Sequence, residues 1–450
     1  MRKSWLWLTA LACGGPAAAA CDDEGTIQLP FQDGGPESST PFDASTPFEA
    51  GTFVDSAAPP EGGGDAEAGV APPSRLLLSY NGSASSELVA FGLQSKAVDG
   101  RMTYQDYLGL AYVGSTAPWL LEQSTDIVAR LDAQQPWVVD SSWNVAMNDL
   151  TDAGYAESYS DPQAVIVNAG TKAYVLRYTR NLIGIIDAST VVDGGVPMAP
   201  IDLSSQVQAA GDGYVQPVAG VYVAAQQRVY VLLGNINRND VVDNGYDLLC
   251  AATTPTVIAI DTMNDTLIDL NGTAPGDGWP LVGYNPIQGP GALAYDPLTG
   301  ASGRLLILEA GCNTVDADGG AGALVKREVE SLDLSAGTAT ELLDLTTQAF
   351  PSGLTYISAS QAIVQLDTAY VWNPTTTALG AAIPNAPDAF VYDGVGNLLG
   401  VSSSYGADGG FEGYAVVSVS VPAGTVTNLG TNPFTLTGGF VGGVALWPAP

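Results

Sequence analysis

The amino-acid sequence predicts an all-β protein whose main domain is a seven-bladed β-propeller, placed behind a signal region and a disordered linker. Three observations predict this fold. Beyond residue 75 the chain consists of short apolar, β-branched and aromatic runs separated by Gly, Pro, Asn and Asp. No amphipathic-helix period extends over about twelve residues there. One strand pattern recurs seven times, which indicates a repeat architecture.

The N-terminus has the features of an export signal. Arg2 and Lys3 provide positive charge, residues 5–12 form an apolar run, and small residues follow. We therefore expect residues 1–20 to be a signal peptide. Its apolar run is too short to span a bilayer as a helix, and no later run is long enough either.

Cys21 directly follows three alanines. This resembles a bacterial lipobox, and the resemblance implies that Cys21 is lipidated and becomes the new N-terminus. The match departs from the usual pattern because Ala18 stands where Leu is common, and Cys13 is an alternative. Ordinary cleavage near Ala20, which leaves a soluble protein, is the competing interpretation.

Residues 21–74 form the predicted linker. From residue 22 onwards it holds eleven acidic residues and no basic one, with Gly, Pro, Ser and Ala dominating, so it cannot bury enough apolar surface to fold. Two tandem hexapeptides occupy residues 39–44 and 45–50. The favoured interpretation is a spacer; an O-glycosylated stalk or a docking motif are alternatives.

The predicted domain, residues 75–450, contains two strand signatures. The first starts with Pro and a small residue two positions later, which suits an innermost strand; it occurs at residues 162–167, 290–295, 351–356 and 387–392. The second is an alternating strand with a small or polar last residue; its copies end at Gly92, Asp132, Asp187, Asp261, Asp333, Asn373 and Ser420. Their spacings of 40, 55, 74, 72, 40 and 47 residues fit four-stranded blades with insertions.

A further strand lies between the two signatures, as in residues 173–176 and 229–232. In three blades we expect only two residues to join it to the next strand: Thr125-Asp126, Arg180-Asn181 and Asp367-Thr368. Residues 172–178 with 185–187 resemble a blade of the bacterial YVTN-type and WD-repeat-like propellers. The resemblance implies the fold and carries no catalytic motif; a β-sandwich is the alternative.

The two ends of the domain complement each other. Residues 442–447 read as an innermost strand without downstream partners, and residues 76–80 and 89–92 lack an innermost strand upstream. Pairing them in one blade closes the ring and removes both exposed edges.

Charge and composition exclude several functions. The chain has 14 Lys plus Arg against 47 Asp plus Glu, a formal net charge of −33, which argues against nucleic acid and anionic lipid partners. It contains no histidine, which excludes Ser-His-Asp and Cys-His nucleophiles and His-ligated zinc or copper. The acidic surface serves solubility or, alternatively, collects calcium.

Three links between second and third strands are long: residues 235–256 in blade four, 312–326 in blade five and 406–414 in blade seven. Blades four and five are neighbours, so their insertions should meet. Each holds one cysteine, Cys250 and Cys312, and we predict a disulfide between them. A redox pair is the alternative, without a C-x-x-C motif to support it.

The same two insertions are rich in oxygen ligands. The candidate calcium ligands are Asp240, Asp243, Asp247, Asp316 and Asp318. The preceding run Asn235-x-Asn237-x-Asn239 resembles an EF-hand start, but the Gly at position six and the Glu at position twelve are missing. Solvated turn residues in an acidic protein are the alternative.

Links between blades add aromatic residues on the same face. Tyr155 and Tyr159 precede blade three, and Trp279 and Tyr284 precede blade five. If exposed beside carboxylates, these rings suit binding of carbohydrate or peptide. The alternative is that they pack the loops against the domain.

The sequence therefore favours a monomeric, non-catalytic binding or scaffold lipoprotein on the outer membrane or cell surface, with the periplasm as an alternative. Its ligand is a protein or a glycan, and its only membrane contact is the lipid anchor. The rival is a calcium-dependent propeller enzyme, a lactonase-like hydrolase or a lyase. That enzyme needs acidic side chains at the starts of innermost strands, where Gln163, Gly291, Ser352 and Asp388 stand.

Overall fold

The computed structural model describes residues 74–113, 117–149, 158–168, 172–242, 247–272, 276–299, 302–317, 319–405 and 410–448. All described residues belong to one compact unit. The predicted signal peptide, Cys13, Cys21 and the linker up to residue 73 lie outside the described residues. No helix among the described residues is long and apolar enough to cross a membrane.

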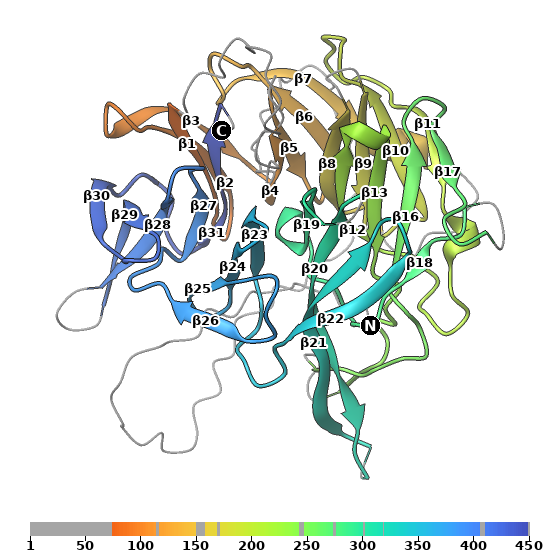
Figure 1. The fold of residues 1–450 in the computed structure, drawn as a ribbon. Coiled ribbons are helices and arrows are strands. Elements are labelled where there is room, and N and C mark those ends of the chain that lie inside the picture. The colour runs from red at the N-terminus through yellow and green to blue at the C-terminus, as the bar shows by residue number, and fades with distance from the viewer. Residues whose placement is uncertain are drawn as a thin grey trace. The chain divides into compact units, whose positions relative to one another are not determined.

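Seven antiparallel sheets, each of four main strands, form a propeller ring (Figure 1). Innermost strand first, blade 1 contains β31 (Phe440–Trp447), β1 (Arg75–Asn81), β2 (Ser86–Gly92) and β3 (Ala97–Tyr104). Blade 2 contains β4 (Leu108–Val113), β5 (Pro118–Glu122), β6 (Ile127–Leu131) and β7 (Val139–Asn144). Blade 3 contains β8 (Pro162–Asn168), β9 (Lys172–Arg177), β10 (Leu182–Asp187) and β11 (Met198–Asp202).

Blade 4 contains β12 (Pro217–Val223), β13 (Arg228–Leu233), β16 (Thr256–Asp261) and β17 (Thr266–Ile268), with β18 (Trp279–Pro280) also paired to β16. Blade 5 contains β19 (Leu293–Asp296), β20 (Arg304–Val315), β21 (Ala321–Asp333) and β22 (Thr338–Asp344). Blade 6 contains β23 (Gly353–Ser358), β24 (Gln361–Gln365), β25 (Ala369–Trp372) and β26 (Leu379–Ala382). Blade 7 contains β27 (Ala389–Tyr392), β28 (Asn397–Tyr405), β29 (Phe411–Ser420) and β30 (Val426–Thr431).

Short elements lie in the links between these strands. A two-stranded ladder, β14 (Val241–Val242) with β15 (Asp247–Leu248), lies in the second link of blade 4. The described 3-10 helices are η1 (Val145–Asn148), η2 (Ser204–Gln206), η3 (Ala224–Gln226) and η5 (Pro290–Ala292).

Burial differs between inner and outer strands for a physical reason. In β9 every residue after Lys172 is buried, because inner strands are packed between the two neighbouring blades. In β3 exposed and half-buried residues alternate, since only one face of this outer strand packs on another blade. All seven third strands lie where their signature predicted.

The ring closes as the sequence predicts. β31 pairs antiparallel with β1, with Arg75 opposite Trp447 and Leu78 opposite Val444. Figure 1 shows this C-terminal strand beside the N-terminal strand of the domain. The pairing joins both chain ends within one sheet, so the inner edge of β1 is paired.

The prediction of two-residue links is wrong in detail. The three links occupy residues 123–126, 178–181 and 366–368, so they have three or four residues. In blade 3 the reason is visible: the amides of Tyr178 and Thr179 donate to the carbonyls of Asp161 and Ser160. These residues therefore pair with the segment entering the blade and not with the next strand.

Amide side chains near the ends of second strands bond the segment that enters the next blade. Asn81 in blade 1 donates to the carbonyl of Leu108 at 3.0 Å and accepts from its amide at 2.9 Å. Equivalent contacts join Asn181 to Gly213 and Val215, Gln365 to Asp388, and Gln123 to Pro162. We call these contacts the blade clamps.

Candidate functional site

The insertions of blades 4 and 5 meet, and a disulfide joins them. Cys250 and Cys312 are bonded with their Cα atoms 5.1 Å apart, across 62 residues of sequence. The amide of Cys250 donates to the carbonyl of Asn313 at 3.0 Å, and Leu249 forms a parallel bridge with Asn313. The predicted disulfide is therefore confirmed. The predicted loop of blade 5 is instead a β-hairpin, because β20 and β21 continue past the blade.

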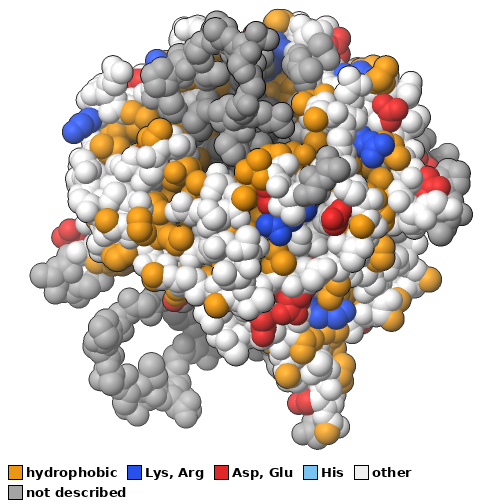
Figure 2. Space-filling model, in the orientation of Figure 1, with side chains coloured by type: hydrophobic (Ala, Val, Ile, Leu, Met, Phe, Trp, Pro, Cys, Tyr) orange, Lys and Arg blue, Asp and Glu red, His pale blue; other side chains and the backbone are white. Residues whose placement is uncertain are grey.

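Figure 2 shows apolar side chains over this projecting hairpin and acidic side chains at its base. Val315 near the tip is 60% exposed, and Ala323 on the opposite strand is also exposed. Because β22 pairs with β21 only as far as Glu328, the outer part of the hairpin stands clear of the blade.

Tyr284 does not lie on the surface, contrary to the expectation. Its side chain is fully buried in a small apolar cluster with Ile236, Leu248 and Cys312. Its hydroxyl lies 3.1 Å from that of Thr253 and accepts from the amide of Ala251 at 3.4 Å. Tyr284 therefore anchors the blade 4 insertion and presents no face to a ligand. For this residue the alternative holds, that the aromatic side chain packs a loop against the domain.

Trp279 is also buried, although the sequence suggested an exposed side chain. It lies in β18, which pairs with β16, and only 9% of its surface is exposed. The ring packs against Gly337 in the last turn of blade 5, where an added Cβ would approach the indole Nε1 to 2.1 Å. Packing between neighbouring blades explains this aromatic residue, so its predicted availability for binding is wrong.

Three glutamates gather beneath the insertion on one face of blade 5. Glu309 stands directly opposite Glu328 in the ladder, and Glu330 follows two residues later on the same face. Glu309 and Glu330 are fully buried and Glu328 is 4% exposed. Among the described residues, neither carboxyl oxygen of Glu309 has a hydrogen-bond partner, whereas Glu330 accepts from the amides of Val282 and Gly283 at 3.0 and 2.8 Å.

Burial raises the pKa of all three carboxyl groups. The pKa of Glu328 rises to about 8 and that of Glu330 to about 7, and burial with Glu330 and Glu328 nearby holds that of Glu309 well above its ordinary range. Desolvation is the largest cause in each case, because an apolar blade interior disfavours the charged form. Sequence analysis missed this cluster, since a Glu at every second position also fits a solvated strand face.

The predicted calcium ligands are only partly described. Asp243 and Asp318 lie outside the described residues, and the side chain of Asp247 is not described. The carboxylate of Asp240 accepts from the amide group of Asn237 at 2.9 Å, and that of Asp316 from the backbone amide of Gly320 at 2.8 Å. In the described part of the chain, no group of three or more His, Cys, Asp or Glu side chains is arranged to hold a metal ion.

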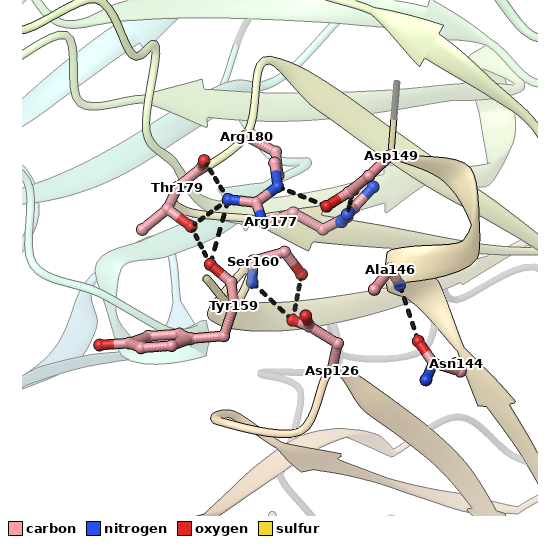
Figure 3. Close-up of polar contacts among 9 residues, drawn as sticks. All are labelled: Asp126, Asn144, Ala146, Asp149, Tyr159, Ser160, Arg177, Thr179 and Arg180. Carbon is pink, nitrogen blue, oxygen red and sulfur yellow. Dashed lines mark hydrogen bonds and ion pairs between the residues drawn. The ribbon is translucent and has the colours of Figure 1, made fainter. Parts of the chain in front are cut away.

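A buried polar network anchors the link between blades 2 and 3 (Figure 3). Asp149 accepts hydrogen bonds from Arg177 and Arg180, the second at 2.8 Å, and both guanidinium groups are almost fully buried. Arg180 also donates to the carbonyl of Tyr159 at 3.1 Å, and the amide of Ser160 donates to Asp126 at 2.6 Å. Two buried guanidinium groups need such carboxylates to offset their desolvation.

This network holds both described ends of the link. Tyr155 lies outside the described residues, so its predicted binding role stays a prediction. Tyr159 is half-exposed, and Figure 3 shows its ring pointing away from the polar network. Its backbone is fixed by Thr179, whose hydroxyl donates to its carbonyl at 2.6 Å.

Two of the residues at the starts of innermost strands differ in their surroundings. Gln163 is buried, and Asp388 is exposed with its carboxylate accepting from the amide of Ser403 at 2.6 Å. The sequence did not single out Glu122, a carboxyl group at the end of β5. It is 3% exposed. Burial raises the pKa of Glu122 to about 8, and the hydroxyl of Thr125 donates to it at 3.1 Å.

An aromatic cluster on blade 7 was not predicted from the sequence. Tyr405 and Phe411 face each other across the hairpin of β28 and β29, with ring centroids 5.9 Å apart. They are 59% and 51% exposed. Tyr414 lies 5.1 Å from Phe411 and 5.5 Å from Phe434, so the exposed pair continues into a packed base.

Comparison with known proteins identifies the fold and no family. No protein-family model matches the chain, and no curated protein matches its sequence. Among solved structures, a functionally unknown protein from Desulfotomaculum acetoxidans is 10% identical with a TM-score of 0.51, over 84% of this chain and 100% of that one. The dihydro-heme d1 dehydrogenase NirN is 11% identical with a TM-score of 0.48, over 92% and 83%.

The β-propeller domain of Cps50 (Swd1) from Myceliophteria thermophila is 10% identical with a TM-score of 0.37, over 79% of this chain and 95% of that one. At such identities a likeness reports the fold alone. The chain is a seven-bladed β-propeller.

Proposed function

We propose that this propeller is an exported, non-catalytic binding module, anchored as a lipoprotein through Cys21 and carried on the acidic linker. The observation that carries the proposal is the disulfide-bonded pair of insertions on blades 4 and 5. It fixes a projecting hairpin on the ring, and a surface ordered before binding loses less entropy when a ligand docks. The disulfide supports an oxidising compartment, as export requires.

The ligand is a protein or a glycan that contacts the hairpin tip. Val315 is 60% exposed there, and removing its apolar surface from water on docking favours binding. A calcium-dependent hydrolase or lyase is the rival, and the test separates the two.

The test uses the full-length oxidised chain and three probes: a soluble neutral β-glucan, a protein without net charge and an acidic protein. We expect saturable binding of one probe, weakened at least about tenfold by Val315→Arg or Ala323→Arg because the charge must be desolvated on docking. Val395→Arg is the matched control, since Val395 is 84% exposed on a turn of blade 7. Binding is measured by calorimetry.

Mass spectrometry of the bound probe, with and without added calcium, tests the non-catalytic part of the proposal. We expect an unchanged probe in both cases. A cleaved probe would establish the enzyme. Equal binding by V315R, A323R and V395R, or no binding of any probe, would contradict the assignment of the docking face.

A further inference from the structure

Basic side chains are absent from the last part of the chain. Residues 328–450, which include blades 6 and 7, contain no Lys or Arg and ten Asp or Glu. Figure 2 accordingly shows no blue side chain over β25 to β30. The acidic groups of this segment are not offset by basic residues of the same segment, and the negative field that results attracts cationic groups.

The exposed aromatic pair of blade 7 lies within this region. Tyr405 and Phe411 close the described part of the hairpin, and more than half of each side chain is accessible to solvent. Phe411 packs on Tyr414 at the base of the hairpin. Exposed neighbouring rings of this size mark interaction sites more often than scattered single residues do.

The base of the pair is fixed. Tyr80 lies 4.8 Å from Phe434 and 5.8 Å from Tyr414. The hydroxyl of Tyr80 accepts from the amide of Gly439 at 2.7 Å, and that of Tyr414 donates to the carbonyl of Gly439 at 3.4 Å. The exposed rings therefore stand on a rigid support that joins blades 7 and 1.

Two acidic residues are neighbours of the aromatic pair, one in sequence and one through a hydrogen bond to β28. Glu412 is exposed and directly follows Phe411. Asp388 is exposed and accepts from the amide of Ser403, which places its carboxylate two residues along β28 from Tyr405. Aromatic faces and carboxylates together are the groups that recognise Arg and Lys side chains, because the ring quadrupole and the negative charge both attract the cation.

We propose that Tyr405, Phe411, Glu412 and Asp388 form a docking site for an Arg- and Lys-rich polypeptide segment. The site is separate from the blade 4 and 5 insertion and does not depend on it. A neutral glycan would use the rings but gain nothing from the carboxylates or from the absence of basic residues around them.

The test measures fluorescence anisotropy of a labelled twelve-residue peptide of alternating Arg and Ser, with a citrulline-for-Arg peptide as the uncharged control. The full-length chain is compared with the double variant Tyr405→Ser/Phe411→Ser. The matched control is Phe350→Ser, which removes a ring that is 49% exposed elsewhere and lies 5.6 Å from Arg327. Melting temperatures check that each variant is folded.

We expect the Arg peptide to bind the wild type and F350S equally, and Y405S/F411S at least about tenfold more weakly. Glu412→Gln with Asp388→Asn should weaken binding and reduce its dependence on salt between 50 and 500 mM. Equal binding by Y405S/F411S and wild type would show attraction to the general charge and overturn the site. Failure of the Arg peptide to bind, or binding of chitohexaose or cellohexaose at these rings instead, would overturn it too.

Discussion

Glu309 illustrates how one residue can set the pH response of the domain. No donor in the described part of the chain bonds either of its oxygens, and two more buried carboxyl groups lie on the same sheet face. A carboxyl group in this position is stable only when protonated, because ionisation would leave an unpaired charge in an apolar interior. The neutral form is favoured by the fold and the ionised form by the unfolded chain.

The free energy of unfolding should therefore fall as the pH rises from about 5 to about 9. The unfolded glutamates release their protons near the ordinary value of 4.5, whereas the folded Glu330 and Glu328 hold theirs until about 7 and about 8. Between these limits the folded state binds more protons, and each group lowers stability by up to about 1.4 kcal/mol per pH unit.

Urea unfolding at each pH measures this slope. We expect Glu309→Gln and Glu330→Gln to flatten it, since a neutral amide cannot ionise, while Glu412→Gln, exposed on blade 7, leaves it unchanged. Stability that rises with pH over this range would show that the three carboxyl groups are not buried together.

At the scale of elements, the blade clamps decide how one sheet is aligned with the next. Asn81 uses both ends of its amide group on the backbone of Leu108, and the side chain is 3% exposed. Asn181 repeats the same two-way contact with Gly213 and Val215. These contacts satisfy backbone groups that lie between sheets, where no ladder partner is available.

Asn81→Ala should lower the free energy of unfolding by about 2–4 kcal/mol, because it leaves a buried amide and a buried carbonyl without partners. Asn264→Ala is the matched control: Asn264 is exposed, and its side chain bonds only the exposed end of Asp261 at 3.0 Å. Chemical denaturation measures both. A loss no larger than that of N264A would show that the clamp is dispensable.

At the scale of the whole molecule, the ring depends on one pairing between residues far apart in sequence. β31 is the innermost strand of blade 1 and contacts both β4 and β27, so it belongs to three neighbouring blades at once. Without it, the inner edge of β1 is open and the apolar cluster around Leu76, Leu446 and Val401 is exposed. Unpaired inner edges promote association between molecules.

Deletion of residues 440–450 should therefore abolish cooperative thermal unfolding and produce aggregates, seen by light scattering. The matched control is deletion of residues 22–73, which keeps every described residue and should leave the melting transition unchanged. A monomeric, cooperatively melting protein without residues 440–450 would show that the ring closes without this strand.

The sequence by itself determined the seven repeats, their strand order, the closure by the chain ends and the disulfide. Each depends on local periodicity, on fixed turn residues such as Pro162 or Pro387, or on the pairing of two cysteines that stand alone in the domain. These features can be recognised within one repeat, because inner strands are apolar in every blade of the ring.

Only the tertiary structure decided which side chains face solvent. Tyr284 and Trp279 look like exposed loop aromatics in sequence but are buried, whereas Tyr405 and Phe411 stand exposed on a strand. Glu309, Glu328 and Glu330 look like a solvated face but share an apolar interior. Burial is a property of what packs against a residue, and in a ring of blades that neighbour comes from another repeat, which no local pattern encodes.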